Sequence, residues 1–382
     1  MNAPSASGGR LRRTIGENCR DELASLADAV APLQVQRLTV AYGLNAPVVR
    51  ELSFALQPYE IACLLGPSGC GKTTVLRAVA GFVPLLDGRV VVGGREASSP
   101  THSEPPERRG VGVVFQDYAL FPHLSIADNI AFGLRRWSAR ERERRVGEML
   151  QLAGLKGLAK RFPHELSGGQ QQRVALGRAL APQPALVLMD EPFSNLDVDL
   201  RERLSGEVRE ILKASGTSAV LVTHDQHEAF AMADVIGLMH EGRIDQWDAP
   251  YELYHRPASR FAADFVGAGT FVRGLLRDIA GERRIAIALG DLDAGALAHS
   301  GPGQVVDVLL RPDDVIHDDA APMTAAVVRK LFRGAEFLYT LRLDSGEEVL
   351  SLVSSHHNHA IGERIGVRLE VDQVVAFPAG SG

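Results

Sequence analysis

The stretch Gly66-Pro-Ser-Gly-Cys-Gly-Lys-Thr-Thr74 decides the fold of the chain. It fits the pattern G-x-x-x-x-G-K-[ST], in which a glycine-rich loop leads from a strand into a helix. The wholly apolar run Ile61–Leu65 is typical of a buried parallel strand, and residues 73–80 predict a helix that ends at Gly81. Backbone N–H groups and the positive end of the helix dipole then point at an anion. We therefore expect a nucleoside triphosphate to bind here, rather than an ordinary glycine turn.

Two side chains of this loop suit the phosphates and their metal ion. Lys72 is expected to reach the β- and γ-phosphates, and the hydroxyl group of Thr73 is expected to ligate Mg²⁺. The residues predicted to surround the nucleotide here are Gly66, Pro67, Ser68, Gly69, Cys70, Gly71, Lys72, Thr73 and Thr74.

Length and composition limit the class of protein. A chain of 382 residues is long for one domain and sufficient for two. The net charge of −6 argues against a nucleic-acid partner. The three cysteines, Cys19, Cys63 and Cys70, suit neither a disulfide framework nor a zinc site, which favours a reducing cytosol. No apolar run approaches the roughly 20 residues of a membrane span, so another chain would have to supply one. We expect residues 1–33, which lack the apolar segment of a signal peptide, to form a flexible tail.

A second sharp pattern is Leu166-Ser-Gly-Gly-Gln170, which precedes the helical pattern of residues 171–180. A helix that begins here offers free backbone donors and hence a second anion site. In isolation the same residues could be an ordinary helix cap.

The apolar run 185–189 ends in Asp190 and Glu191. Carboxylates at the carboxyl end of a buried strand lie where α/β sheets bind ligands. Asp190 can hold Mg²⁺, and Glu191 can orient or deprotonate an attacking water molecule. Capping of the next helix does not explain this pair, because that helix is expected only after Asp197.

Three further residues lie beside predicted strands. His224 follows the buried strand Ser218–Thr223, where a contact to the γ-phosphate is favoured over a structural role. Gln116 follows the strand predicted at residues 111–115. Tyr42 precedes the phosphate loop and could stack on adenine or lie half-buried at a sheet edge.

Beyond about Gly269, short alternating segments replace helical periods and predict a small, barrel-like all-β domain. These segments are residues 285–289, 305–310, 325–331, 337–343, 348–353 and 365–371. A polar loop there contains His356-His-Asn-His359. Because no acidic or cysteine partner lies nearby in sequence, we interpret these as loop histidines rather than metal ligands.

Together these motifs resemble the ATP-binding subunit of ABC transporters, in particular that of bacterial binding-protein-dependent importers. The resemblance is strong over about residues 33–267 and looser beyond. Residues 66–74 resemble the Walker A loop, and residues 186–191 resemble Walker B with its catalytic glutamate. Leu166-Ser-Gly-Gly-Gln170 matches the ABC signature. Gln116 is similar to the Q-loop glutamine, His224 to the switch histidine, Tyr42 to the A-loop aromatic and residues 194–197 to the D-loop, with Asn195 in place of a more usual alanine.

The resemblance implies an α/β fold in three parts. The flexible tail, residues 1–33, would precede an ABC ATP-binding domain at residues 34–267, with a RecA-like core, an antiparallel β subdomain and a helical subdomain at about 120–182. A regulatory β domain of the TOBE type would occupy residues 268–382.

The resemblance also implies a mechanism in which two copies pair head to tail around two ATP molecules. Ser167, Gly168, Gly169 and Gln170 of one copy would contact the nucleotide held by the other. The implied catalytic residues are Glu191, His224, Gln116 and Lys72, and the implied Mg²⁺ ligands are Thr73, Gln116 and Asp190.

Family membership would make transmembrane permease subunits the direct partners and a periplasmic substrate-binding protein an indirect one. The chain would lie peripherally on the cytoplasmic face of the inner membrane. Residues 252–267 and 310–314 are similar to importers of ferric iron, polyamines, thiamine, sulfate and sugars, with ferric iron favoured. A soluble ABC ATPase of DNA repair or translation, and a small-molecule kinase, are the alternatives. The first typically carries a coiled-coil insertion or two nucleotide domains, and the second has no use for the signature.

Overall fold

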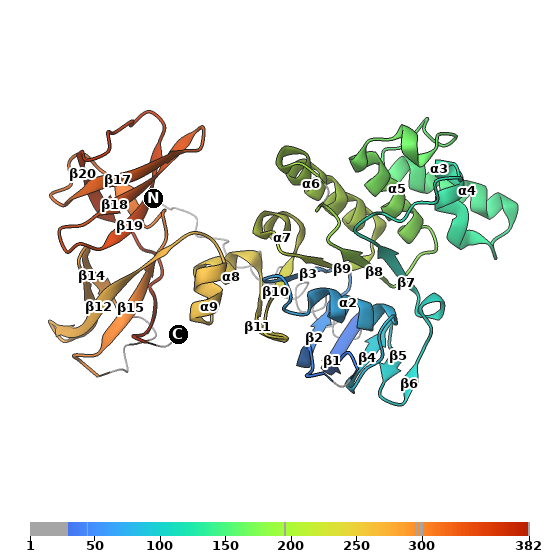
Figure 1. The fold of residues 1–382 in the computed structure, drawn as a ribbon, viewed down its shortest axis with the longest axis horizontal. Helices are drawn as coiled ribbons and strands as arrows, with labels where there is room; N and C mark the ends of the chain where they lie inside the picture. The colour runs from blue at the N-terminus through green and yellow to red at the C-terminus, as the bar shows by residue number, and fades with distance from the viewer. Residues whose placement is uncertain (1–29, 44, 195, 295–296, 298–300, 381–382) are drawn as a thin grey trace, which may run out of the picture. The chain divides into compact units, whose positions relative to one another are not determined.

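The structure is a computed structural model, and it describes residues 30–43, 45–194, 196–294, 297 and 301–380. Most of the expected N-terminal tail, and Asn195 of the D-loop, lie outside these described residues. The chain divides into two compact units, Met1–Ile244 and Asp245–Gly382 (Figure 1). The boundary predicted between residues 267 and 268 stays a prediction.

A six-stranded, mainly parallel sheet organises the first unit, in the order β11-β10-β3-β9-β8-β7. The bounds are β3 Ile61–Leu65, β7 Val111–Val114, β8 Leu186–Asp190, β9 Ser218–Thr223, β10 Val235–His240 and β11 Arg243–Asp248. All residues of β3 and β9 are buried. Strands covered on both faces need apolar residues throughout, which explains the continuous apolar runs of the sequence. Helix α2 (Lys72–Ala80) packs on β8 and β9, and α7 (Gln226–Met232) packs on β3 and β9.

A second sheet of this unit is antiparallel, in the order β2-β1-β4-β5-β6. Its strands are β1 Leu33–Val40, β2 Val49–Leu56, β4 Asp87–Val92, β5 Arg95–Ser99 and β6 His102–Ser103. The end of β5 and all of β6 lie in the Ser- and Pro-rich stretch 98–106, where no apolar alternation predicts a strand. The polar side chains of these strands give no apolar alternation to recognise. Buried Ser98 instead accepts a hydrogen bond from the guanidinium group of Arg109, at 2.6 Å.

The helices of the first unit begin and end where local chemistry predicts. Helix α4 (Ala139–Leu152) starts at a capping box of Ser138 and Glu141. Helix α6 (Val198–Ser215) runs from Asp197, which caps it, to Gly216, whose φ of 62° suits glycine. Helices α3 (Ile126–Ala131), α4 and α5 (Gly168–Leu180) pack against one another, within the segment predicted as a helical subdomain. No helix among the described residues has the length and apolar character needed to cross a membrane.

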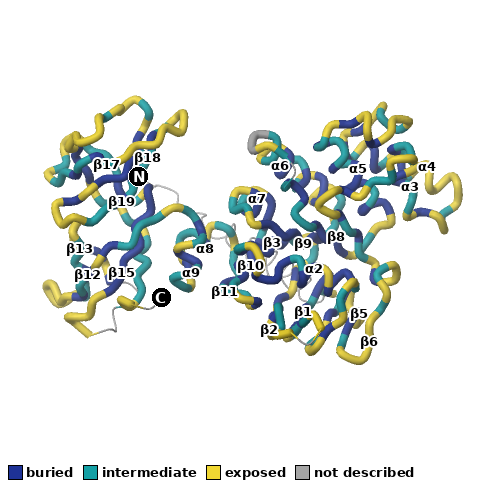
Figure 2. Tube along the Cα trace, viewed as in Figure 1, coloured by how far each residue is buried: buried dark blue, intermediate teal, exposed yellow. Residues whose placement is uncertain are grey.

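The second unit starts at Asp245, within β11. It then contains α8 (Pro250–His255), α9 (Arg260–Phe265) and two five-stranded antiparallel sheets. The first consists of β12 Thr270–Ile279, β13 Glu282–Ile287, β14 Gly290–Asp293, β15 Val305–Leu310 and β21 Val375–Pro378. The second consists of β16 Val315–His317, β17 Thr324–Phe332, β18 Glu336–Arg342, β19 Glu348–Ser354 and β20 Arg364–Leu369. The sheets share one apolar core, and Figure 2 shows the buried stretches of their strands in dark blue. This confirms the barrel-like all-β domain.

Candidate nucleotide-binding site

The phosphate loop lies between β3 and α2, as predicted. Gly66 has a φ of 156°, and a Cβ atom added there would lie 2.3 Å from the backbone oxygen of Met239, so a larger residue does not fit. Gly71 caps the helix with a φ of 107°, and Gly81 ends it with a φ of 89°. The loop therefore depends on glycine where backbone segments approach each other most closely.

Lys72 extends back over this loop. Its side chain is only 5% exposed, and its ammonium group donates to the carbonyl oxygens of Gly66, at 2.7 Å, and Pro67, at 2.9 Å. A buried ammonium group needs such acceptors. A phosphate oxygen would be a stronger acceptor, because it carries charge.

The carboxyl ends of the parallel strands bring the other predicted residues to the same edge of the sheet. Residue pairs Leu65↔Thr223, Asp190↔Val222 and Val114↔Met189 are in register. Gly66, His224, Glu191 and Gln116 follow these strand ends by one or two residues. The edge is therefore the place where ligands bind in sheets of this kind.

Asp190 lies directly against the start of α2. The hydroxyl group of Thr73 donates to its Oδ1 at 3.1 Å. Burial raises the pKa of Asp190, and the hydrogen bond from Thr73 opposes this shift. A carboxylate beside a hydroxyl group supplies the hard oxygen ligands that Mg²⁺ prefers, so these residues fit the ion.

Glu191 and His224 face each other next to this pair. Glu191 Oε1 lies 3.4 Å from His224 Nδ1. The backbone of Glu191 has a φ of 44°, which is uncommon for a residue other than glycine, and its N–H donates to the Val222 carbonyl group at 3.0 Å. Such strained residues cluster at functional sites.

Tyr42 lies beside the loop with an exposed ring. The side chain is 42% exposed, and its hydroxyl oxygen is 3.3 Å from that of Thr74. Tyr42 lies two residues after the end of β1, so the structure is compatible with both interpretations, and they stay open. Stacking on adenine stays a prediction.

The signature segment is held as a helix cap. Ser167 caps α5 and accepts from the N–H of Gln170 at 3.4 Å, while the Gln170 side chain accepts from the N–H of Ser167 at 3.1 Å. A Cβ atom added at Gly169 would lie 2.6 Å from the side chain of Leu204 on α6, so the glycine allows close packing. A contact from this segment to a nucleotide in a second copy stays a prediction.

Arg178 on α5 was not predicted as part of the site. Its guanidinium group donates to the carbonyl oxygens of Tyr118, at 2.8 Å, and Ala119, at 2.6 Å. Both residues have positive φ values, 60° and 44°. Arg178 thereby joins the signature helix to the segment that follows Gln116.

A polar network around Asp225, the residue after His224, was also not predicted from the sequence. Arg201 donates to Asp225 at 2.6 Å and lies 3.4 Å from Glu228, which in turn accepts from the hydroxyl group of Thr223 at 2.6 Å. Burial favours a higher pKa for Asp225, but hydrogen bonds from Arg201 and from the N–H groups of His227 and Glu228 outweigh it and lower the pKa. The capping pattern of Asp225 before a helix was the available signal.

This network predicts a pH-dependent contribution to stability. The lowered pKa means that Asp225 stabilises the fold above its ordinary value of 3.8, and that this stabilisation is lost as pH falls through the folded-state pKa. We expect Asp225→Asn to lower the free energy of unfolding at pH 7 by about 1–2 kcal/mol. The difference should shrink as the pH is lowered from 7 to below 3.8. Urea unfolding followed by Trp137 fluorescence in a Trp247→Phe background measures it, and an equal loss at both pH values would contradict this account.

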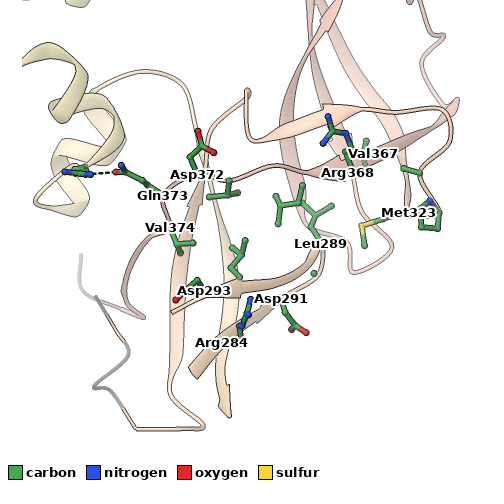
Figure 3. A pocket seen from close by; sticks show the side chains of 17 residues that line it. Arg284, Leu289, Asp291, Asp293, Met323, Val367, Arg368, Asp372, Gln373 and Val374 are labelled. Carbon is green, nitrogen blue, oxygen red and sulfur yellow. Dashed lines mark hydrogen bonds between the residues drawn. The ribbon is translucent and has the colours of Figure 1, made fainter. Parts of the chain in front are cut away.

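A separate cavity of about 950 Å³ lies in the second unit. Figure 3 shows Leu289, Met323 and Val367 lining it alongside Arg284 and Asp291. None of the predicted nucleotide-site residues lines this cavity. Apolar and oppositely charged side chains are mixed here, which favours no single class of ion.

The fold and the loop define a nucleoside triphosphatase of the phosphate-loop class. The sequence profile of the ABC transporter family matches residues 49–194, and that of the TOBE domain matches residues 308–377. The chain belongs to the ATP-binding subunits of ABC transporters and is an ATPase that binds ATP.

The names of two similar proteins state two different transported substrates. A spermidine/putrescine import ATP-binding protein, PotA of Rubrobacter xylanophilus, is 41% identical over 84% of this chain and 85% of its own length. An Fe(3+) ions import ATP-binding protein, FbpC of Streptomyces avermitilis, is 41% identical over 92% of this chain and 99% of its own length. The solved structure of cbiO1 from Clostridium perfringens, part of the ABC transporter complex cbiONQ, has a TM-score of 0.54 at 25% identity. It covers 58% of this chain and 90% of that one.

Proposed function

We propose that ATP hydrolysis by this chain powers solute import through membrane permeases, from the cytoplasmic face of a bacterial inner membrane. The observation that carries this proposal is the likeness to import ATP-binding proteins over both units of the chain, up to 92% of its length. A soluble ABC ATPase of repair or translation would not need the second unit, which matches a TOBE domain.

The proposed site forms between two copies that pair head to tail. Lys72 exchanges its carbonyl acceptors for phosphate oxygens, and Tyr42 stacks on the adenine ring. The helix N-terminus at Ser167, Gly168, Gly169 and Gln170 of the second copy closes over the γ-phosphate, because its backbone donors and dipole favour an anion. ATP thus holds the two copies together, and its hydrolysis releases them.

Thr73 and Asp190 would hold Mg²⁺, with Gln116 completing the shell. When bound, the ion neutralises charge on the β- and γ-phosphates. Before it binds, the Thr73 hydroxyl group and the Asp190 carboxylate satisfy each other. The desolvated carboxylate keeps few other partners, which favours exchange of this hydrogen bond for a cation.

Glu191 is the proposed general base. Its carboxylate accepts a proton from the attacking water molecule, and its strained backbone, tied to Val222, fixes the direction of the side chain. His224, 3.4 Å away, holds that carboxylate in place and contacts the γ-phosphate. Asp225, the residue after His224, is held by Arg201 at 2.6 Å.

Ferric iron is the proposed cargo, with polyamines as the second candidate and thiamine, sulfate or sugars behind them. The similarity of residues 310–314 to ferric-iron importers supports this order. The length of the match does not, because a putrescine transport ATP-binding protein of Escherichia coli matches 93% of this chain and 97% of its own length. The periplasmic binding protein and the permease would select the cargo. This chain would supply only the ATP hydrolysis that drives transport.

Reconstitution with the co-purified permease subunits tests the proposal. We expect the ATPase rate in proteoliposomes to rise several-fold when a ferric-loaded binding protein is added, and to stay unchanged with the iron-free protein. Stimulation by a spermidine-loaded binding protein instead would keep the import mechanism and replace the cargo. If no permease co-purifies and no binding protein stimulates, the import proposal is wrong.

A further inference from the structure

Three histidines gather at one place in the second unit. His317 ends β16, whereas His357 and His359 lie in the connection between β19 and β20. One ring nitrogen from each lies within 4.8 Å of the others. The ring centroid of His317 is 4.8 Å from those of His357 and His359. The fold thus adds a ligand 40 residues upstream to a pair that looked like ordinary loop histidines.

Side chains from two strands hold the histidine loop in place. The hydroxyl group of Tyr339 on β18, a fully buried side chain, donates to the carbonyl oxygen of His357 at 2.9 Å and accepts from the N–H of His359 at 3.0 Å. Lys330 on β17 donates to the carbonyl oxygen of His359 at 3.0 Å. Both histidines therefore have fixed backbone positions, as a preorganised site requires.

A carboxylate only four residues after His359 orients its ring, so the expectation that no acidic partner lies nearby in sequence was wrong. Glu363 Oε1 lies 2.8 Å from Nδ1 of His359, and its other oxygen accepts from the N–H of Ala360 at 2.7 Å. The proton of His359 is thereby held on Nδ1, which leaves Nε2 with a free lone pair. A carboxylate behind a histidine is the usual support of a metal-ligating imidazole.

Two ring nitrogens in the cluster are buried and make no hydrogen bond to the described residues. Nε2 of His359 and Nε2 of His317 have no hydrogen-bond partner among the described residues. Asp319 Oδ1 is 3.0 Å from the latter, but the geometry of the contact is not that of a hydrogen bond. Buried polar atoms without partners are rare in native proteins and indicate a missing ion or water molecule.

We propose that His317, His357 and His359 bind a divalent transition-metal ion, with Zn²⁺ as the best-suited ion. Imidazole ligands suit Zn²⁺, Ni²⁺ and Cu²⁺, whereas the hard ferric ion prefers oxygen ligands. Zn–N bonds of about 2.0–2.1 Å place the nitrogens of a tetrahedral site roughly 3.3 Å apart. The three nitrogens, which lie within 4.8 Å of one another here, would have to approach by side-chain rotation when the ion binds. Asp319, whose side chain is 76% exposed, or a water molecule takes the fourth position.

The bound ion would tie β16 to the β19–β20 connection and stabilise the second unit. This inference does not rest on the proposed transport function, because every ligand belongs to the second unit and metal binding is measured without ATP hydrolysis.

The test is Zn²⁺ binding to the untagged full-length chain after treatment with a chelator. Competition with a chromophoric chelator should give one tight Zn²⁺ per chain. His357→Ala, which replaces an exposed side chain, should weaken binding at least about 100-fold, and Glu363→Gln about 10–100-fold. His356→Ala, an exposed neighbour outside the cluster, is the matched control and should bind as the wild type does.

Co²⁺ in place of Zn²⁺ identifies the ligands. The cobalt protein should show the visible absorption of a four-coordinate site without a thiolate charge-transfer band. Equal Zn²⁺ affinity of the wild type and His357→Ala would overturn the proposal, and so would a thiolate band. Without metal, both histidine variants should unfold at the wild-type temperature, which separates lost ligation from lost folding.

Discussion

Replacement of Glu191 by glutamine is expected to lower ATP turnover about 10²–10⁴-fold, the usual contribution of a general base. Glutamine has the same shape but cannot accept the proton of the attacking water molecule. ATP binding should persist, because the phosphate loop and Lys72 are unchanged. Phosphate release at saturating ATP measures turnover, and titration with a fluorescent ATP analogue measures binding.

Glu210→Gln is the matched control for this variant, since it removes an exposed carboxylate on α6 and should leave turnover unchanged. Near wild-type hydrolysis by Glu191→Gln would show that another group takes the proton. A parallel loss of ATP binding would show that Glu191 supports the loop rather than the reaction.

Lys72→Ala is expected to weaken ATP binding by on the order of 100-fold, because charge-assisted hydrogen bonds to phosphate are lost. The variant also removes the donor to the carbonyl oxygens of Gly66 and Pro67. Since water can reach these oxygens once the side chain is gone, we expect only a modest loss of stability. Equilibrium binding of the ATP analogue measures the effect.

Lys156→Ala, at an exposed position, controls for the loss of one positive charge and should bind ATP normally. Thermal unfolding without nucleotide shows whether Lys72→Ala is folded. A folded Lys72→Ala chain with wild-type affinity would remove Lys72 from the proposed site.

Local patterns predicted the elements whose side chains follow a strict period. Strand β15 begins and ends at the predicted residues, and α6 begins after Asp197, as predicted. The parallel strands were recognised because both faces are buried, so that apolar residues alone remain. Once these strands were placed, the meeting of Asp190, Glu191 and His224 at one edge followed from geometry.

Contacts between distant residues could not be predicted in this way. Arg178 reaches carbonyl oxygens 59 and 60 residues away, and no local pattern marks such a pair. Strands β5 and β6 are short and polar, because their stability comes from pairing and from Arg109 rather than from alternation. His317 joins the histidine cluster because β16 pairs with β20 and packs against β19, contacts that no local pattern marks.

ATP-dependent dimerisation tests the head-to-tail site most directly. It is measured as the molecular mass in solution of two serine variants, each combined with Glu191→Gln. Ser167 and Ser138 are both exposed serines that cap a helix through a capping box, so Ser167→Arg and Ser138→Arg disturb their helices alike. Light scattering with Mg²⁺ and ATP should show dimers for Glu191→Gln and Glu191→Gln/Ser138→Arg, and monomers that still bind ATP for Glu191→Gln/Ser167→Arg. ATP-dependent dimers of the Ser167→Arg variant would contradict a nucleotide site shared between two copies.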